Sequence, residues 1–385
     1  MNIVLLSPHF PEQMGRYANA LSELGVNVLG IGDEPTQLLS PLLRRSLNDY
    51  AYVNNMHNYD ELLRACGLLI SRHGRLDRLE SHNEYWLETE AALRTDFNIA
   101  GVKNDAIRQI KAKSEMKRLF AEAGVDCARG KVVDSLQDAL SYAKELGYPV
   151  VLKPDVGVGA ANTWKAESEE HLRHLFEHKP DVPYILEEFV SGQICTFDGL
   201  TDRNGQIVFC TSMVYSQGVM EVVNSNDHIY YYTVREIPAD LEAAGRKVVQ
   251  AFDVRERFFH LEFFRTADNR LVALEVNMRP PGGPSIDMMN YTHDIDLYRQ
   301  WARVMVYNHF NAPVEAKYFC GYIGRKAQKH YQHSHHEILH AFGEYIVDAG
   351  SLPQVFRQAM GDSYYLCRTP DEADLLEIAA TIQAD

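Results

Sequence analysis

The chain has 385 residues, with 38 Lys and Arg against 53 Asp and Glu, and a formal net charge of −15. This length predicts two or three domains, each large enough to bury a core. An acidic surface repels nucleic acid, so no nucleic-acid partner is expected, although a local basic pocket still admits a small anion. The sequence has no apolar stretch of about 18 residues, so no membrane partner is expected either.

The N-terminus and the cysteines favour a soluble cytoplasmic protein. The first apolar run ends at Ser7 and follows no basic leader, whereas a secretory signal has a charged start and a longer apolar core. The six cysteines are scattered and none forms a Cys-x-x-Cys pair, which favours reduced, buried thiols over a disulfide framework.

Short apolar strands alternate with amphipathic helices over the first hundred residues or so, which predicts a parallel sheet with crossover helices. The junction after the first strand lacks the Gly-x-Gly-x-x-Gly pattern, so no dinucleotide site is expected there. A helix is predicted over 104–123, and strand patterns then recur as far as residue 276. Residues 311–385 mix short strands and helices, which predicts a small α+β piece.

Two neighbouring predicted strands carry the strongest chemical signal. Alternate residues of a strand share a face, so His260 and Glu262 point one way. In the second strand Glu275, Asn277 and Arg279 share a face. If the strands pair, two carboxylates and an amide oxygen converge on a site suited to Mg²⁺, with the arginine free to bind a phosphoryl group or a carboxylate. A charged solvent-facing hairpin is the alternative, but apolar neighbours on both sides of the acidic residues argue against it.

Two weaker signals precede these strands. Lys153 ends an apolar strand before the small-residue loop 155–161, a combination that suits phosphate, although glycine-rich turns after strands are common. Glu187 and Glu188 end another apolar strand. Backbone groups there could bind an adenine base, but an ordinary amphipathic strand end is the simpler interpretation of that segment alone.

Taken in order, these pieces resemble the ATP-grasp superfamily over residues 104–307. The matching features are Lys113 in the lead helix, Lys153 before the glycine loop, the hinge Glu187-Glu188-Phe189-Val190, and then His-x-Glu and Glu-x-Asn-x-Arg-Pro. The resemblance implies three parts: an α/β N-terminal domain (1–103), an α+β ATP-grasp core of two subdomains (104–310) and a small C-terminal α+β piece (311–385).

The resemblance also implies a role for each matching residue. The ATP phosphates would be contacted by Lys113 and Lys153 and covered by the loop that holds Gly157, Gly159 and Ala160. Adenine would be held by Glu187 and by the backbone at Glu188, Phe189 and Val190. Magnesium, or manganese, would be bound by Glu262, Glu275 and Asn277, while Arg279 and Lys153 would serve catalysis by holding the phosphoryl group.

The implied activity is an ATP-dependent ligase that activates a carboxylate as an acyl phosphate and couples it to an amine, releasing ADP and phosphate. Its partners would be small-molecule carboxylate and amine substrates, and a homodimer is the default assembly. Two alternatives stay open: a bicarbonate-activating enzyme similar to biotin carboxylase or a carbamoyl-phosphate synthase domain, and a nucleotide-binding module without turnover. Ile194 favours the last, because the family often has a glutamate at that place after the hinge.

Three further features lie outside these motifs. Glu84 follows a predicted strand end of the first domain, so a carboxylate that faces the site is one interpretation. The residues Tyr230-Tyr231-Tyr232 could contact substrate, although an ordinary aromatic strand is favoured. The histidine-rich run from His330 to His340 favours a polar surface helix over a zinc site, because no cysteine lies close by.

Overall fold

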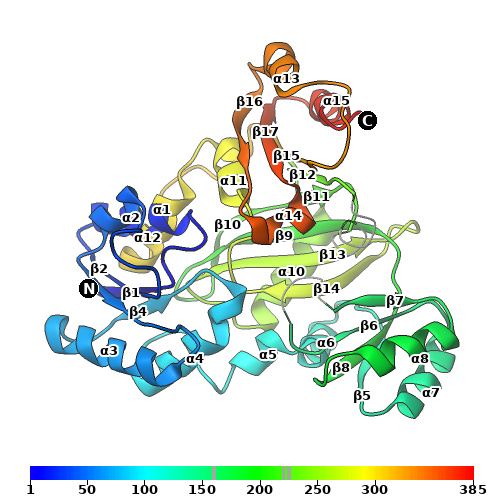
Figure 1. The fold of residues 1–385 in the computed structure, drawn as a ribbon, viewed down its shortest axis with the longest axis horizontal. Coiled ribbons are helices and arrows are strands. Elements are labelled where there is room, and N and C mark those ends of the chain that lie inside the picture. The colour runs from blue at the N-terminus through cyan, green and yellow to red at the C-terminus, as the bar shows by residue number, and fades with distance from the viewer. Residues whose placement is uncertain (158–161, 219–221, 223–226) are drawn as a thin grey trace.

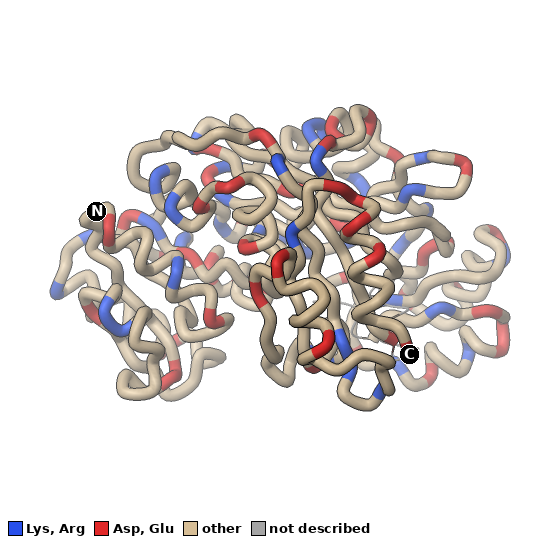
Figure 2. The backbone as a smooth tube through the Cα atoms, turned by 90° about the horizontal axis from the view of Figure 1, so that it is seen from above, with Lys and Arg blue, Asp and Glu red and all other residues tan. Residues whose placement is uncertain are grey.

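The computed structural model describes residues 1–157, 162–218, 222 and 227–385 of the chain (Figure 1). Over these residues a parallel N-terminal sheet and two mainly antiparallel sheets confirm the predicted fold class. No helix in them is both long and apolar enough to cross a membrane. Figure 2 shows acidic and basic residues interspersed in every part of the molecule, so the negative net charge is spread rather than gathered on one element.

The N-terminal part is an α/β unit, as its alternating pattern predicts. Its elements are β1 (Asn2–Leu6), α1 (Met14–Glu23), β2 (Asn27–Gly32), α2 (Pro41–Ser46), β3 (Asp49–Tyr52), α3 (Tyr59–His73), β4 (Arg78–Glu80), the 3-10 turn η1 (Glu84–Trp86) and α4 (Leu87–Asp96). The strands pair in parallel in the order β3-β2-β1-β4. Ile3 and Leu5 of β1 belong to one apolar core and Val4 and Leu6 to another, because both faces of a parallel sheet are covered.

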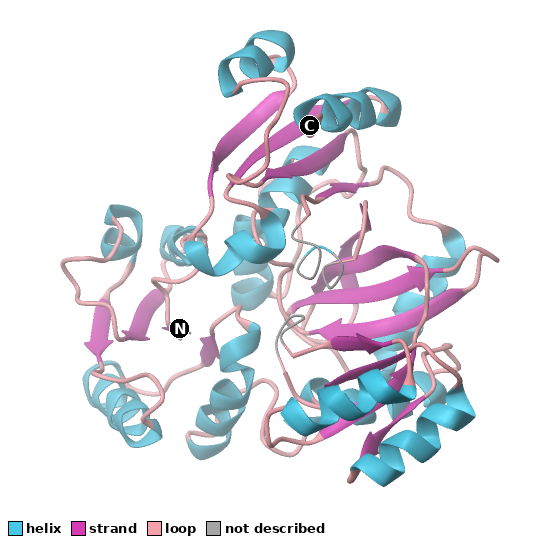
Figure 3. Ribbon diagram, turned by 45° about the vertical axis from the view of Figure 1, so that its right-hand side comes forward, coloured by secondary structure: helices cyan, strands magenta, loops and turns pink. Residues whose placement is uncertain are grey.

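A small antiparallel sheet follows, covered on one face by two helices (Figure 3). Its elements are α5 (Ile107–Lys111), α6 (Lys113–Glu122), β5 (Gly130–Val133), α7 (Leu136–Leu146), β6 (Val150–Pro154), β7 (Trp164–Ala166), α8 (Glu169–His178) and β8 (Tyr184–Glu188). The strand order is β5-β8-β6-β7. This arrangement places the end of β6 beside the end of β8, so the predicted phosphate lysine and the predicted hinge are neighbours.

The single helix predicted over 104–123 is wrong, because the chain breaks it into α5 and α6 at Ala112. This residue is extended, with φ −88° and ψ 120°, and forms an isolated bridge with Val156. Asp155 then caps α6: its carbonyl accepts from the Lys113 amide at 2.9 Å and its carboxylate from the Ser114 amide at 2.8 Å. The break is a tertiary effect that alanine, a strong helix former, cannot reveal in the sequence.

The large sheet forms the centre of the molecule. Its elements and their covering helices are β9 (Gln193–Thr201), β10 (Ile207–Thr211), β11 (Met213–Tyr215), β12 (Tyr230–Thr233), α10 (Ala239–Ala251), β13 (Phe258–Arg265), β14 (Leu271–Asn277), α11 (Ser285–His293), α12 (Leu297–Tyr307), β15 (Phe319–Arg325), α13 (His335–Phe342), β16 (Ile346–Ser351), α14 (Gln354–Met360), β17 (Ser363–Thr369) and α15 (Glu372–Ile382). The order is β14-β13-β9-β11-β12-β15-β17-β16, with β10 paired to β9. The C-terminal strands therefore extend the sheet of the core, and the domain boundaries at 103 and 310 stay predictions.

The three consecutive tyrosines form the strand β12 inside this sheet. Tyr231 is buried and its ring lies 4.7 Å from that of Tyr215 and 4.9 Å from that of Tyr322, in stacked arrangements. This packing accounts for the run as an aromatic strand.

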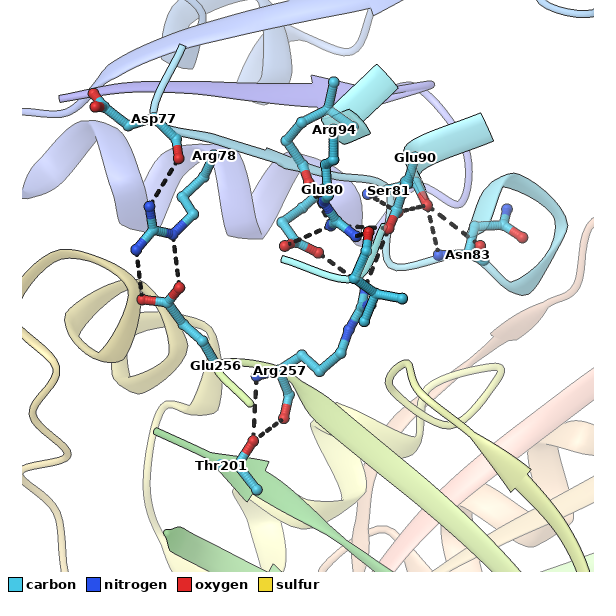
Figure 4. Close-up of polar contacts among 12 residues, drawn as sticks. Asp77, Arg78, Glu80, Ser81, Asn83, Glu90, Arg94, Thr201, Glu256 and Arg257 are labelled. Atoms are coloured by element: carbon cyan, nitrogen blue, oxygen red, sulfur yellow. Dashed lines mark hydrogen bonds and ion pairs between the residues drawn. The ribbon is translucent and has the colours of Figure 1, made fainter. Parts of the chain in front are cut away.

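A buried cluster of four charged side chains joins the N-terminal sheet to the core (Figure 4). Arg257, which precedes β13, lies 3.1 Å from both Glu80 and Glu90. Arg94 lies 2.8 Å from Glu80 and 3.0 Å from Glu90. Glu90 also accepts from the backbone amide of Ser81 at 2.6 Å. The cluster thus connects β4 and α4 to the residue that precedes β13.

Candidate active site

A cavity of about 190 Å³ lies between the small sheet and the β9-β13-β14 edge of the large sheet. It is lined by the predicted residues Lys113, Lys153, Glu187, Glu188, Phe189, Val190, Glu262 and Glu275. Asn277, Arg279 and Gly157 are not among its lining residues, and Gly159 and Ala160 fall outside the described part of the chain. Residues from both sides of the cleft therefore meet as the strand pattern and the resemblance imply.

The two acidic strands pair so that their carboxylates converge. β13 and β14 are antiparallel, with Glu262 opposite Glu275 and His260 opposite Asn277. The Lys113 ammonium lies 3.2 Å from Glu275. Burial by itself lowers the pKa of Lys113, but the surrounding carboxylates, Glu275 first and then Glu187 and Glu84, together hold that pKa above its ordinary value. A cation from α6 thus reaches across the cleft to the acidic strands.

One of these carboxylates, Glu262, belongs to a chain of three hydrogen-bonded side chains. Nδ1 of His260 lies 2.6 Å from Asp198 of β9, and its Nε2 lies 3.0 Å from Glu262. Burial lowers the pKa of His260, but the two carboxylates outweigh it and raise that pKa to about 9. Burial would also raise the pKa of Glu262, yet the hydrogen bond from His260 holds it below its ordinary value. Glu262 therefore stays ionised at neutral pH with a fixed orientation.

Glu187 of β8 is the buried carboxylate on the side of the cleft that the small sheet forms. Its carboxylate lies 2.7 Å from Lys153 and 2.9 Å from Lys117. Burial raises the pKa of Glu187, but the two lysines together lower it below its ordinary value. Glu188, the next residue of β8, instead pairs with Arg129 at 2.7 Å, because alternate strand residues face opposite ways. Any contact of Glu188 with a ligand in the cleft would thus come from its backbone.

The rest of the cleft is apolar and includes the position that departs from the family pattern. Ile194 is 7% exposed and lines the cavity together with Phe264 and Ala273. Phe189 and Val190 of the hinge line it too. An apolar slot with backbone donors and acceptors at one edge suits a planar aromatic base.

Hard oxygen donors for a metal ion are present at the head of the acidic strands. Asn277 is 4% exposed, and its side-chain oxygen accepts from Arg279 at 3.3 Å. With Glu262 and Glu275 it offers two carboxylates and an amide, a donor set that suits Mg²⁺ and leaves coordination positions for water and phosphate. The donor chemistry fits the metal that the fold family implies. Among the described residues no group of three or more His, Cys, Asp or Glu side chains could hold a metal ion, and the histidine-rich run lies around helix α13.

Arg279 connects this site to the N-terminal domain. Its Nε lies 3.5 Å from Glu84, whose carboxylate is bound by Lys111 at 2.6 Å. Glu84 is 6% exposed and lies beside Arg279, although it is not among the residues that line the cleft. The structure thus brings together charged groups from three regions of the chain.

Three of these contacts were not predicted from the sequence. Lys117 follows Lys113 by four residues and shares its helix face, so the helical period carried a usable signal. The partnership of Asp198 with His260 depends on the register between β9 and β13, which no local pattern fixes. Lys111 carried no signal of its own, because its contact with the N-terminal domain arises from domain packing.

Residues 146–287 match the family model described as an ATP-grasp domain. The L-arginine-specific L-amino acid ligase of Bacillus subtilis is 25% identical over 283 residues, which cover 69% of this chain and 66% of that protein. The arginine-specific carbamoyl phosphate synthase large chain of Bacillus subtilis is 24% identical over 196 residues, 49% of this chain but 18% of that one. The matches therefore span less than two thirds of these relatives.

Solved structures share the fold over nearly the whole chain. The L-amino acid ligase from Bacillus licheniformis has a TM-score of 0.76 at 13% identity, covering 99% of this chain and 96% of that one. A biotin carboxylase domain from Hydrogenobacter thermophilus has a TM-score of 0.71 at 15% identity, covering 96% and 86%. Residues 146–287 of this chain thus match an ATP-grasp domain, and the chain as a whole shares the fold of these solved structures.

Proposed function

We propose that this protein is an ATP-dependent ligase that activates a carboxylate as an acyl phosphate and couples it to an amine. The observation that carries the proposal is the convergence of three lysines with Glu262 and Glu275 on one cleft. A structural ion-pair network would not need a cleft with an apolar slot beside it.

ATP is the proposed first substrate and occupies this cleft. Lys113 and Lys153, which both line the cleft, would contact its phosphates, and the base would lie between the hinge and Ile194. When bound at Glu262, Glu275 and Asn277, Mg²⁺ or Mn²⁺ would neutralise charge on the transferring phosphoryl group. The ion pairs of Lys113 and of Glu187 keep these side chains charged in the cleft before the nucleotide arrives.

The proposed chemistry has two steps. A carboxylate oxygen attacks the γ-phosphorus of ATP, the bond to the bridging oxygen breaks, and ADP leaves. The amine nitrogen then attacks the acyl carbon, and phosphate leaves with the oxygen that the carboxylate supplied, while the nitrogen releases a proton to water. Arg279 stabilises the negative charge on the acyl phosphate, because a guanidinium binds phosphate and carboxylate oxygens in pairs.

Relatives by sequence and fold also support bicarbonate activation as a second candidate. The same cleft would then phosphorylate bicarbonate in place of an organic acid. Bicarbonate-dependent release of ADP, with no requirement for another acid, distinguishes the two.

A screen of acid and amine pairs for ADP release tests the proposal. We expect release that needs both an acid and Mg²⁺, and a hydroxamate product when hydroxylamine replaces the amine. Glu275→Gln should abolish turnover, whereas Glu122→Gln, an exposed control on α6, should retain it. Full activity of Glu275→Gln would contradict the proposed metal site. Binding of Mg-ATP without ADP release, for every pair, would instead favour a module without turnover.

A further inference from the structure

A second cavity, of about 510 Å³, lies between the N-terminal domain, the segment 279–283 and helix α14. Its size falls in the range of small-molecule sites. Among the described residues that line it, Arg279 is the one lysine or arginine, and Asp33 and Glu84 are the acidic ones. The remainder is mostly aromatic or aliphatic.

Several buried polar atoms along this cavity have no hydrogen-bond partner within the described protein. They are His9 Nδ1, Tyr17 Oη, His82 Nε2 and one carboxylate oxygen of Glu84. Burial lowers the pKa of His82 to about 3, so its imidazole is neutral. A buried polar atom without a partner costs on the order of 1–3 kcal/mol. Water or the polar groups of a ligand in this cavity would complete these bonds.

The charged side chains at the inner end of this cavity indicate which charged groups a ligand would carry. Glu84 and Arg279 lie 3.5 Å apart at the boundary with the proposed nucleotide cleft, since Arg279 also donates to Asn277. An α-amino acid carries an ammonium and a carboxylate on neighbouring carbons, and therefore presents two charges to such a pair at once. The carboxylate would lie at Arg279, where activation requires it.

The wall away from these charges is apolar. Phe10 stacks on Phe356 of α14 with ring centroids 5.7 Å apart, and Ile286 and Tyr298 lie on the same lining. Asp33 at the rim has a side chain 43% exposed and is 3.5 Å from His9. The described lining thus offers no second buried carboxylate for a cationic side chain, and a large apolar side chain fits it better.

We propose that this cavity binds an α-amino acid with a large apolar side chain as the acid that the enzyme activates. Glu84 binds its ammonium group, Arg279 its carboxylate, and Phe10 and Phe356 contact its side chain. The inference rests on the proposed ligase function, but binding and turnover test the two separately.

Calorimetric binding of L-phenylalanine, with a non-hydrolysable ATP analogue and Mg²⁺ present, is the test. We expect 3-phenylpropionate, which lacks the amino group, and L-arginine each to bind more weakly by roughly 10-fold or more. Glu84→Gln should weaken L-phenylalanine by a similar factor and leave the analogue's affinity unchanged. Glu88→Gln, an equal charge change at an exposed residue of α4, is the matched control.

Equal binding of L-phenylalanine and 3-phenylpropionate, tighter binding of L-arginine, or an unaffected Glu84→Gln variant would each overturn the inference. If Glu84→Gln is unstable, Phe356→Ala takes its place and should weaken the binding of L-phenylalanine but not that of L-alanine. An affinity for L-phenylalanine that is the same in the wild type and in Phe356→Ala would also overturn the inference. ADP release with other acids but no binding of L-phenylalanine would contradict this inference and leave the proposed ligase function standing. Binding of L-phenylalanine without ADP release would instead contradict the proposed ligase function.

Discussion

Replacing Arg257 by methionine removes one cation from the buried cluster that joins the N-terminal domain to the core. The side chains of Arg257, Glu80, Glu90 and Arg94 are 6%, 5%, 0% and 1% exposed, so solvent screens their charges little. In the wild type two carboxylates face two guanidinium groups. The variant leaves one negative charge without compensation in a nearly dry site.

The expected loss of unfolding free energy is about 3 kcal/mol, the lower end of the range for breaking a buried ion pair. The lower end applies because Arg94 still contacts both carboxylates and Ser81 still donates to Glu90. An exposed ion pair would contribute about 1 kcal/mol or less.

Urea unfolding followed by tryptophan fluorescence measures the loss, because Trp301 is buried beside His82 at this interface. A double variant, Arg257→Met with Glu90→Gln, removes one charge of each sign and should be less destabilised than the sum of the single changes by at least about 1 kcal/mol. Additive losses, or a loss below about 1 kcal/mol for Arg257→Met alone, would mean that the buried charges do not depend on one another.

Three other outcomes are expected from the cleft. The pKa of His260 is raised to about 9 from an ordinary 6.5, so protonation of His260 stabilises the fold by about 3 kcal/mol at most; this contribution is complete below pH 6.5 and is lost as pH rises to 9. Urea midpoints across this range should fall in the wild type and stay flat in His260→Gln. Parallel pH profiles of the two proteins would contradict this contribution of His260. Gly130→Ala should weaken binding of an ATP analogue, since a Cβ at residue 130 would lie 2.6 Å from Cγ of Glu187 and would displace that side chain. An unchanged affinity by calorimetry would show that Glu187 can move without weakening nucleotide binding. Lys117→Met should also weaken the analogue, because Glu187 then keeps one lysine partner in place of two, and the exposed Lys131→Met serves as its control.

The sequence predicted the parts of the site that follow strand periodicity. Glu262 and Glu275 face each other because both strands alternate with a period of two and form a hairpin, and each of these properties is local. Lys153 and Glu187 meet across β6 and β8, which local patterns place at strand ends but do not pair. The family resemblance supplied that pairing.

The remainder depends on contacts between distant segments. The break at Ala112 arises from Asp155, forty-odd residues further along the chain, and overrides local helix propensity. Glu84 reaches Arg279 because the N-terminal domain is held against the core, in part by Arg257. The register that brings Asp198 to His260 is likewise set by the whole sheet.

The proposed ligase reaction transfers a carboxylate oxygen to phosphate in the cleft formed by Lys153, Glu262 and Glu275. An acid labelled with ¹⁸O in its carboxylate, turned over with ATP, Mg²⁺ and an amine, measures that transfer by mass spectrometry of the released phosphate. We expect one ¹⁸O atom in each phosphate formed with amide product. Unlabelled phosphate, with amide product still formed, would contradict it.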